Sequence, residues 1–312
     1  MMYLGERKTG CRFYEFVFKG FRCLLVENNV IRTIFLLDKG ADIISFVDKK
    51  TDTEFVWTNP MGISCLDKIR LSKMDNDCFS DNYVGGWFEI LPNVGDACTV
   101  LHKSFSSHAE AAYMPWDYSV CEDSEEKIRL MFITRLSKFP IEVRKYLTLE
   151  KDAAKLCFDE EIINLGGCDV PYNWGFHPNI GKSFLDGDCI FELPFADKRV
   201  RMPQEGSRQD SLTFFENVKM PWARVINERT GIGLEINWDG DFAENCWLWI
   251  SAGEDRGHHH HGGAYVGCIL PTSAKNSDGL EKAYRDGAAQ ILPAGSIRRN
   301  RFSIGVVRKR NN

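Results

Sequence analysis

Two isolated histidines stand in segments rich in aromatic residues, glycine and carboxylates. His177 lies in the run Tyr-Asn-Trp-Gly-Phe-His-Pro-Asn-Ile-Gly at residues 172–181, and His108 lies in Ser-Ser-His-Ala-Glu at residues 106–110. Imidazole has an unperturbed pKa of about 6.5, so it can donate or accept a proton near neutral pH. Both are therefore candidate catalytic residues for acid and base chemistry. The alternative for His177 is a neutral ring packed in a loop, where it makes one hydrogen bond and does no chemistry.

The segment 81–96 offers the flat and polar groups of a small-molecule site. It combines glycines, a tryptophan, a glutamate and an asparagine. Glycine lets the backbone approach a ligand closely, while a ring and polar side chains face it. Such a segment can also be a plain turn. We predict that five residues here and near the histidines bind a ligand: Trp87, Glu89, Asn93, Glu110 and Asn173.

The elements that must position these residues are short and rich in β-forming residues. Runs such as 127–137 and 154–164 are typical of short strands with polar turns between them. Helical patterns are few, at residues 65–74 and 279–285. We predict an all-β fold, a large antiparallel β-sandwich, built as a single domain over residues 1–312. The segments around Trp87 and His177 are predicted as loops.

Composition excludes several classes of partner. The formal net charge is −5 and the pI is about 5.9, so there is no basic field for nucleic acid or anionic lipid. No run approaches the roughly 18 apolar residues that a membrane span needs. The 11 cysteines are irregularly spaced and form no CxxC pair, which argues against a disulfide framework or a zinc ribbon. We expect a cytoplasmic protein with no membrane or nucleic-acid partner, and the oligomeric state stays open.

Several motifs, taken in order, resemble the aldose 1-epimerase (galactose mutarotase-like) superfamily. Residues 28–51 resemble its first sheet with a Gly-Ala turn. Gly-Gly-Trp-Phe-Glu-Ile-Leu-Pro-Asn at 85–93 is similar to the GGW-x-E-x-x-PN segment of one branch, and His-Ala-Glu at 108–110 stands where that branch has His-Gly-Glu. Asn-Trp-Gly-Phe-His-Pro follows at 173–178. The resemblance covers nearly the whole chain.

The resemblance implies a galactose mutarotase-like β-sandwich with a sugar cleft on its concave face. In the mutarotase reaction a histidine donates a proton to the ring oxygen of an aldose while a glutamate takes the proton of the anomeric hydroxyl. The ring opens, the C1–C2 bond rotates, and reclosure gives the other anomer. His177 matches the proton-donating histidine, and His108 matches the second histidine that holds the sugar oxygens. The partner implied is a small-molecule sugar, with no cofactor.

The sequence departs from the family pattern at the base. Family members carry glutamate in a Pro-Gly-Glu turn, whereas this chain has Leu-Pro-Ala-Gly-Ser at 292–296, and a second family glutamate is replaced in Leu-Pro-Thr-Ser at 270–273. Serine does not act as a base at neutral pH without help. The carboxylates that remain as substitutes are Glu89, Glu110, Glu254 and Asp255.

The run His258 to His261 invites a metal interpretation. Consecutive histidines between glycines, without a cysteine at ligand spacing, are more typical of an exposed tract than of a defined site. We therefore predict no native metal site.

Two functions from different classes remain. The first is an aldose 1-epimerase-like enzyme that interconverts anomers of a monosaccharide or sugar derivative by acid/base ring opening. The second is a noncatalytic carbohydrate-binding or sensing protein that kept the cleft after the glutamate was lost. Turnover separates the two, because only the first accelerates anomer exchange.

Overall fold

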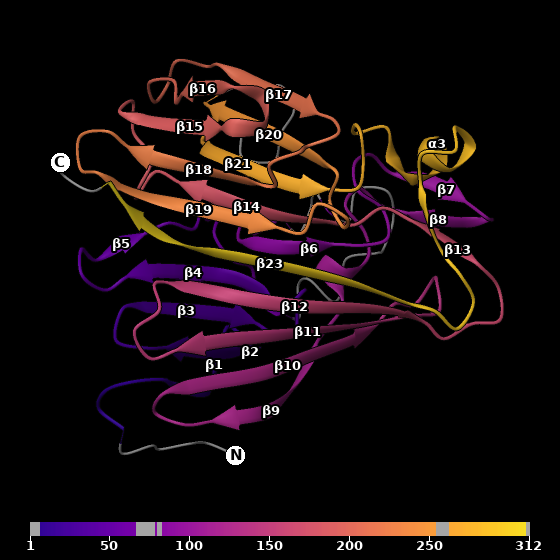
Figure 1. Cartoon of the computed structure of the whole chain (residues 1–312), viewed down its shortest axis with the longest axis horizontal. Helices are drawn as coiled ribbons and strands as arrows, with labels where there is room; N and C mark the ends of the chain where they lie inside the picture. The colour runs from indigo at the N-terminus through magenta and orange to yellow at the C-terminus, as the bar shows by residue number, and fades with distance from the viewer. Residues whose placement is uncertain (1–6, 67–78, 80–82, 254–261, 310–312) are drawn as a thin grey trace.

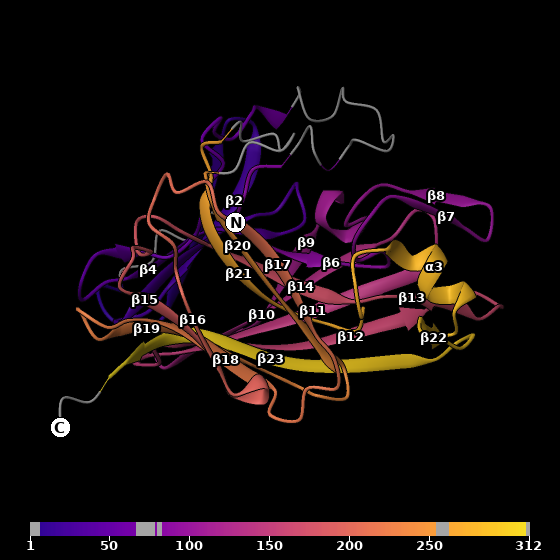
Figure 2. The same ribbon diagram turned by 90° about the horizontal axis from the view of Figure 1, so that it is seen from above.

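The computed structural model describes residues 7–66, 79, 83–253 and 262–309. Within this part of the chain, two large antiparallel sheets form a β-sandwich (Figure 1). Seen from above, a small group of elements that includes α3, β7, β8 and β13 lies together at one end of the molecule (Figure 2). The predicted all-β sandwich is confirmed.

The ten-stranded sheet runs in the order β1-β2-β3-β4-β6-β14-β21-β20-β17, with β5 paired to β4. Its strands are β1 Arg12–Phe18, β2 Phe21–Glu27, β3 Ile31–Leu36, β4 Asp42–Asp48, β5 Thr53–Glu54, β6 Trp87–Ile90, β14 Gly175–Gly181, β17 Asp210–Phe215, β20 Asn245–Ala252 and β21 Tyr265–Thr272. Neighbours along the chain pair from β1 to β4 and again at β20 and β21, while β6 and β14 join the two halves.

The nine-stranded sheet runs in the order β16-β15-β18-β19-β23-β12-β11-β10-β9. Its strands are β9 Asp117–Asp123, β10 Lys127–Arg135, β11 Ile141–Glu150, β12 Lys155–Asn164, β15 Cys189–Leu193, β16 Lys198–Arg201, β18 Trp222–Asn227, β19 Ile232–Trp238 and β23 Ile297–Arg308. The last of these, β23, is 12 residues long and lies in the middle of the sheet, between β12 and β19.

Among the described residues, the remaining elements are two short two-stranded sheets, one of them a hairpin, and three short helices. They are β7 Cys98–Val100 with β8 Lys103–Phe105, β13 Val170–Tyr172 with β22 Gln290–Leu292, the 3-10 helices η1 Ala111–Tyr113 and η2 Pro194–Ala196, and the helix α3 Gly279–Arg285. The position of α3 confirms the helix predicted over 279–285. The other predicted helix, 65–74, lies almost entirely outside the described residues.

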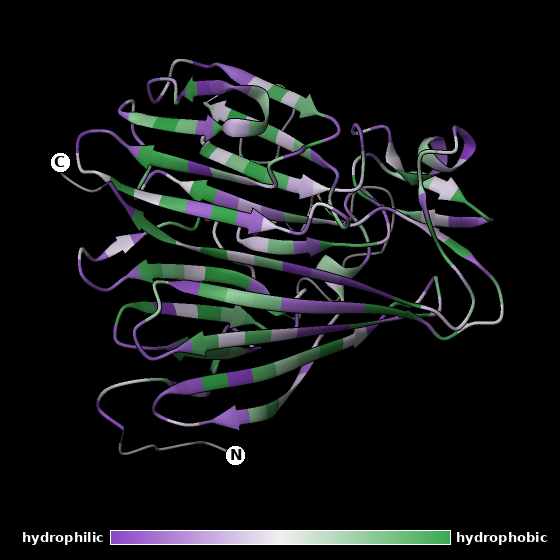
Figure 3. Ribbon diagram, viewed as in Figure 1, coloured by the Kyte–Doolittle hydropathy of each residue, from purple (hydrophilic) through white to green (hydrophobic). Residues whose placement is uncertain are grey.

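Alternation of hydropathy explains why the two sheets stack. In strands such as β10 and β12 buried and more exposed residues alternate, and most of the buried positions are hydrophobic (Figure 3). The inner faces interdigitate through aromatic rings. Phe35 and Phe132 lie 4.9 Å apart across the sheets, and Phe176 and Phe302 lie 4.5 Å apart. Burial of this face provides the main driving force for the sandwich.

His177 lies in a central strand of the sheet, where the sequence predicted a loop. It belongs to β14, and Trp87 belongs to β6, which pairs with β14. Every residue of β6 and β14 is buried, so neither strand shows the period-two pattern of burial that marks a half-exposed strand. Pro178 interrupts the ladder between β14 and β21, whose Cα pairing passes from Gly175 directly to Asn179.

Candidate functional site

The pairing of β6 with β14 places Phe88 directly opposite His177. Both side chains point away from the inner core, because their strand neighbours Trp87 and Phe176 belong to that core. The phenyl and imidazole rings stack with centroids 4.7 Å apart and an angle of 11° between their planes. His177 is therefore fixed on the outer face of the ten-stranded sheet, with one side of its ring covered.

His108 reaches the same place from the loop that follows β8. Its backbone has φ +50°, and its Nδ1 accepts a hydrogen bond from the backbone N–H of Gly95 at 3.2 Å. The ring meets His177 edge to face, with centroids 5.6 Å apart and planes at 68°. The structure thus brings together the two histidines that the sequence predicted as catalytic.

Aromatic rings and a thiol complete the surroundings, and the sequence analysis did not select these residues. Phe79 lies edge-on to His108 at 4.9 Å, and Trp249 lies 6.2 Å from His177. Cys268 places its Sγ 3.3 Å from Nδ1 of His177. The signal for Trp249 was its i, i+2 spacing from a second tryptophan within β20, which puts both rings on one face. We use the term histidine cluster for six residues: Phe79, Phe88, His108, His177, Trp249 and Cys268.

Both histidines are neutral at pH 7 in this environment. Burial, with the neighbouring His108, lowers the pKa of His177 well below its ordinary value of 6.5. Burial lowers the pKa of His108 to about 4. An imidazolium at His177 is consequently a minor species in the unliganded protein, and an activity that needs it will increase as the pH falls.

We expect the pKa of His108 to make the protein less stable in acid. An unfolded histidine has a pKa near 6.5, so between about pH 6.5 and 4 the unfolded state binds a proton that the folded state does not. The free energy of unfolding falls as the pH decreases through this window, by about 1–2 kcal/mol between pH 7 and 5 from this residue. His108→Asn removes the titration and keeps a residue that tolerates positive φ. Urea unfolding of both proteins at the two pH values measures the difference, and equal pH dependence would contradict it.

Glu89 points in the opposite direction, into the core between the sheets. Its Oε2 accepts from Nζ of Lys145 at 2.6 Å, and its Oε1 accepts from Nε1 of Trp174. The same Nζ lies 3.0 Å from Oε1 of Glu160, whose Oε2 accepts from the amide of Asn300 at 2.7 Å. Burial and the charge of the neighbouring Glu89 raise the pKa of Glu160 above its usual range. Glu89 is thus part of a buried ion pair that joins the two sheets.

Trp87 and Glu110 are also engaged in the framework. The indole of Trp87 packs 5.0 Å from the ring of Phe46, and its Nε1 donates to the carbonyl of Asn179 at 2.8 Å. The carboxylate of Glu110 is fully buried and accepts from the backbone N–H groups of residues 137–138 at 2.8 and 3.2 Å. The structure brings neither side chain into contact with His177.

The two predicted asparagines differ from each other. The amide of Asn93 donates to the carbonyls of Asp96 and Ser106, both at 2.9 Å, and its Oδ1 accepts from the N–H of Leu280 at 2.8 Å, so it ties three segments together. Asn173 is buried, and its Oδ1 has no hydrogen-bond partner among the residues that the structure describes. Asn173 therefore retains an acceptor for a ligand or a water.

Asp210 is a candidate base that the sequence analysis did not consider. Of the predicted substitutes, Glu254 and Asp255 lie outside the described residues. Ser296 closes its own turn, with Oγ donating to the carbonyl of Pro293 at 2.7 Å. Asp210, at the start of β17, accepts from Nε1 of Trp249 at 3.1 Å, which links a carboxylate to the histidine cluster.

A cavity of about 640 Å³ is connected to the histidine cluster through a chain of aromatic contacts, although no residue of the cluster lines it. Trp57 lines it beside Glu205 and Lys182. The indole of Trp57 lies 5.6 Å from the ring of Tyr83, which in turn lies 6.1 Å from Phe88. This hollow gives the outer face of the ten-stranded sheet a volume of the size that small-molecule sites have.

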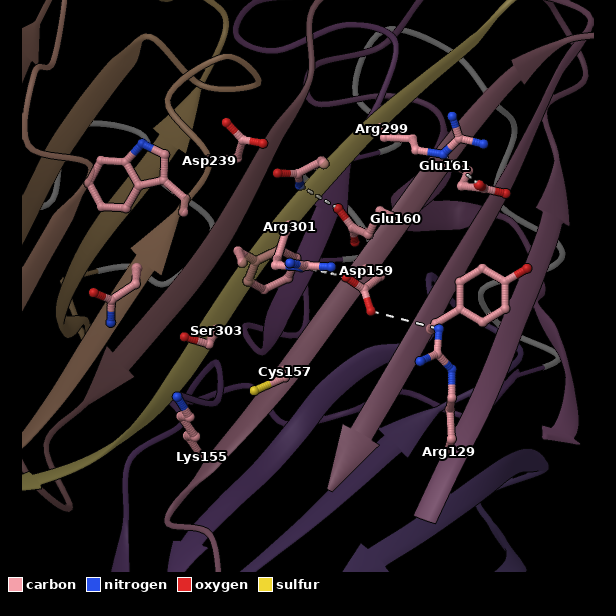
Figure 4. Close-up of a pocket in the computed structure, with 15 residues that line it drawn as sticks. Arg129, Lys155, Cys157, Asp159, Glu160, Glu161, Asp239, Arg299, Arg301 and Ser303 are labelled. Carbon is pink, nitrogen blue, oxygen red and sulfur yellow. Dashed lines mark hydrogen bonds and ion pairs between the residues drawn. The ribbon is translucent and has the colours of Figure 1, made fainter. Parts of the chain in front are cut away.

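A second cavity, of about 1000 Å³, opens on the nine-stranded sheet (Figure 4). Charged pairs between β12 and β23 cross its floor: Arg301 binds Asp159 at 2.6 Å, and Arg299 binds Glu161 at 3.0 Å. None of the residues that line it is a histidine, and the cross-strand pairs satisfy one another. Despite its size, this cavity lacks the pair of histidines that distinguishes the other face.

Two further findings concern metals and membranes. Within the part of the chain that the structure describes, there is no group of three or more His, Cys, Asp or Glu side chains placed to hold a metal ion. The tract His258 to His261 lies outside the described residues. No described helix is long and apolar enough to cross a membrane.

Comparison with known proteins gives matches in structure alone. No protein-family model and no curated protein matches the sequence. A candidate aldose 1-epimerase from Klebsiella pneumoniae superposes with a TM-score of 0.79 at 12% identity, over 96% of this chain and 85% of that one. A galactose mutarotase related enzyme from Lactobacillus acidophilus gives 0.65 at 16% identity, over 91% and 96%. A galactose mutarotase-like protein from Clostridium acetobutylicum gives 0.66 at 11%, over 96% and 99%. At these identities the similarity establishes the fold.

Proposed function

Starting from the galactose mutarotase-like sandwich that this chain shares with those structures, we propose that the protein interconverts the anomers of a monosaccharide or sugar derivative. The observation that carries the proposal is the contact between His177 and His108, two rings from distant segments that meet at 5.6 Å on the outer face of the ten-stranded sheet. Around them lie the aromatic rings of Phe88 and Trp249, which suit a ligand with apolar faces and a polar edge.

In the proposed reaction, His177 hydrogen-bonds the ring oxygen of the sugar and protonates it from the imidazolium form. The C1–O5 bond breaks as Asp210 takes the proton of the anomeric hydroxyl, and the open chain carries a carbonyl at C1. Rotation about C1–C2 and the reverse proton transfers close the other anomer. We assign the acceptor role to Asp210 because its contact with Trp249 places a carboxylate beside the ring that flanks His177. Positioned proton transfer of this kind is typically worth roughly 10² to 10⁴-fold in rate.

The second candidate, a sugar-binding protein without turnover, has an observation of its own. The pKa values of both histidines are lowered, and Glu89 and Glu110 are held by framework contacts. A cleft with two neutral imidazoles binds a sugar by hydrogen bonds without transferring protons.

One experiment separates the two functions. NMR exchange spectroscopy on a panel of aldoses measures the rate of anomer exchange with and without the protein, and thermal denaturation measures sugar-dependent stabilisation. We expect faster exchange for at least one sugar. Stabilisation without faster exchange would establish the binding protein instead, and neither effect for any sugar would overturn both.

Trp249 provides a prediction about binding. Its half-buried indole beside His177 offers a face on which a sugar ring can stack, so Trp249→Ala should weaken sugar binding by about tenfold, equivalent to ~1.4 kcal/mol. The matched control is Trp222→Ala, a half-buried tryptophan on β18 in the other sheet. Isothermal titration of both variants measures the difference. Equal affinities would place the sugar elsewhere.

A further inference from the structure

Each histidine of the cluster has one ring nitrogen already occupied, and in both rings it is Nδ1. The backbone N–H of Gly95 points at Nδ1 of His108 at 3.2 Å. A backbone N–H is only a donor, so this nitrogen must be the unprotonated acceptor. A neutral His108 therefore carries its proton on Nε2.

The partner of His177 is a thiol. Sγ of Cys268 lies 3.3 Å from Nδ1, and both residues are buried on neighbouring strands, β21 and β14. Burial raises the pKa of Cys268 well above its usual value, so the thiol keeps its proton. A thiol donates weakly and its sulfur accepts weakly, but a neutral imidazole nitrogen is the better acceptor of the two atoms. The S–H group thus donates to Nδ1 and leaves the imidazole proton on Nε2.

Two further groups lie within hydrogen-bond reach of the His177 ring, the side-chain amide of Asn179 and the backbone carbonyl of His177 itself. Burial and the neighbouring His108 lower the pKa of His177, whereas both of these groups raise it. Phe88 covers one face of the ring at 4.7 Å, and the indole N–H of Trp249 is directed to Asp210. The thiol is the hydrogen-bonding contact that the described part of the chain places on Nδ1.

We propose that Cys268 and the backbone N–H of Gly95 hold the two histidines in one tautomer, so that both present Nε2–H and together form a two-donor site for acceptor oxygens of a neutral ligand. A ring oxygen with a neighbouring hydroxyl, as in a neutral sugar, offers such a pair of acceptors. Cys268 is a positioning residue, because it acts through His177. The identity of the ligand rests on the proposed function, whereas the tautomer does not.

The test reads the tautomer directly in the unliganded protein. Protein with 15N-labelled histidine is studied by long-range 1H–15N correlation at pH 7.5, where the protonated and unprotonated ring nitrogens differ strongly in chemical shift. Replacing His258 to His261 by serine simplifies the spectrum, and His177→Asn and His108→Asn assign the two rings. We expect both rings to show protonated Nε2 and unprotonated Nδ1.

Variants then test the role of the thiol. Cys268→Ala should lose the single Nε2–H pattern of His177, while Cys268→Ser, which keeps a donor, should retain it. Cys246→Ala is the matched control, since this buried cysteine lies on the adjacent β20 in the inner core and should leave the tautomer unchanged. Protonated Nδ1 on His177 in the wild type, or an unchanged pattern in Cys268→Ala, would overturn the proposal.

The tautomer can be determined even if one variant does not fold, and independently of the proposed function. If Cys268→Ala does not fold, the wild-type spectrum and Cys268→Ser decide the tautomer by themselves. The tautomer is read without sugar, so the two proposals fail separately. Absence of anomer exchange would refute the proposed function alone. A protonated Nδ1 on His177 would refute the proposed tautomer alone. If exchange is found, Cys268→Ala should lower kcat while Cys268→Ser restores it, which separates positioning from a loss of fold.

Discussion

Replacing Lys145 with methionine should destabilise the protein by about 3–5 kcal/mol, because it leaves the buried carboxylate of Glu89 without its counter-ion. Lys145 is 7% exposed, and its Nζ lies between Glu89 at 2.6 Å and Glu160 at 3.0 Å. Three phenylalanine rings surround the same ammonium at 5.2 to 5.5 Å, so no water can replace it easily. Urea unfolding at pH 7 measures the loss.

Two further variants show whether the charge is the cause. Glu89→Gln in the Lys145→Met background removes the uncompensated carboxylate and should recover a large part of the stability. Lys151→Met removes an exposed lysine that pairs with Glu125 and Glu126 at 2.7 and 2.8 Å, and it should change stability little. A Lys145→Met protein as stable as the wild type would mean that the buried cluster is uncharged.

His177→Asn should lower anomer exchange by about 10² or more while the protein stays folded. The substitution removes the proton donor and keeps a polar side chain of similar reach. His102→Asn is the matched control, because this histidine is exposed in the turn between β7 and β8. An unchanged exchange rate in His177→Asn would remove His177 from the mechanism, and a protein that fails to fold would show that the histidine is structural.

The pH dependence of the wild-type rate adds a second readout. Because the pKa of His177 is lowered well below 6.5, the imidazolium fraction above that pKa falls about tenfold for each unit of pH. We expect the rate to rise as the pH is lowered from 8 to 6, and the slope to disappear in His177→Asn. A rate independent of pH in the wild type would indicate that the neutral ring acts as a hydrogen-bond donor alone.

Strands rich in β-forming residues and bounded by polar turns were predictable from the sequence. Residues 154–164 were predicted as such a strand, and the structure forms β12 over Lys155–Asn164. The same signal is weaker at β6 and β14, which are buried on both faces. β14 contains glycine, proline and asparagine, and β6 is flanked by Gly85-Gly86 and Pro92-Asn93, residue types that usually mark turns. The strands that carry the site were therefore the ones predicted as loops.

Residue types identified the two histidines, but spacing along the chain did not reveal their neighbours. His108 and His177 meet only because β6 and β14 pair and the loop after β8 folds over them. Glu89 was selected as a carboxylate beside a predicted ligand loop, yet the strand alternation turns it toward the core. Trp249 and Cys268 come from two further strands, and sequence alone gives no register between them.

The central position of β23 has a consequence for how the protein is made. The strand that joins β12 to β19 is the last one along the described chain, so a ribosome releases it after all its partners. Until it arrives, the nine-stranded sheet consists of two separate blocks, each with an unpaired edge that could pair with another chain. Productive folding of the nascent polypeptide therefore has to wait for β23, and deletion of β23 should give an aggregating chain and not a smaller folded one.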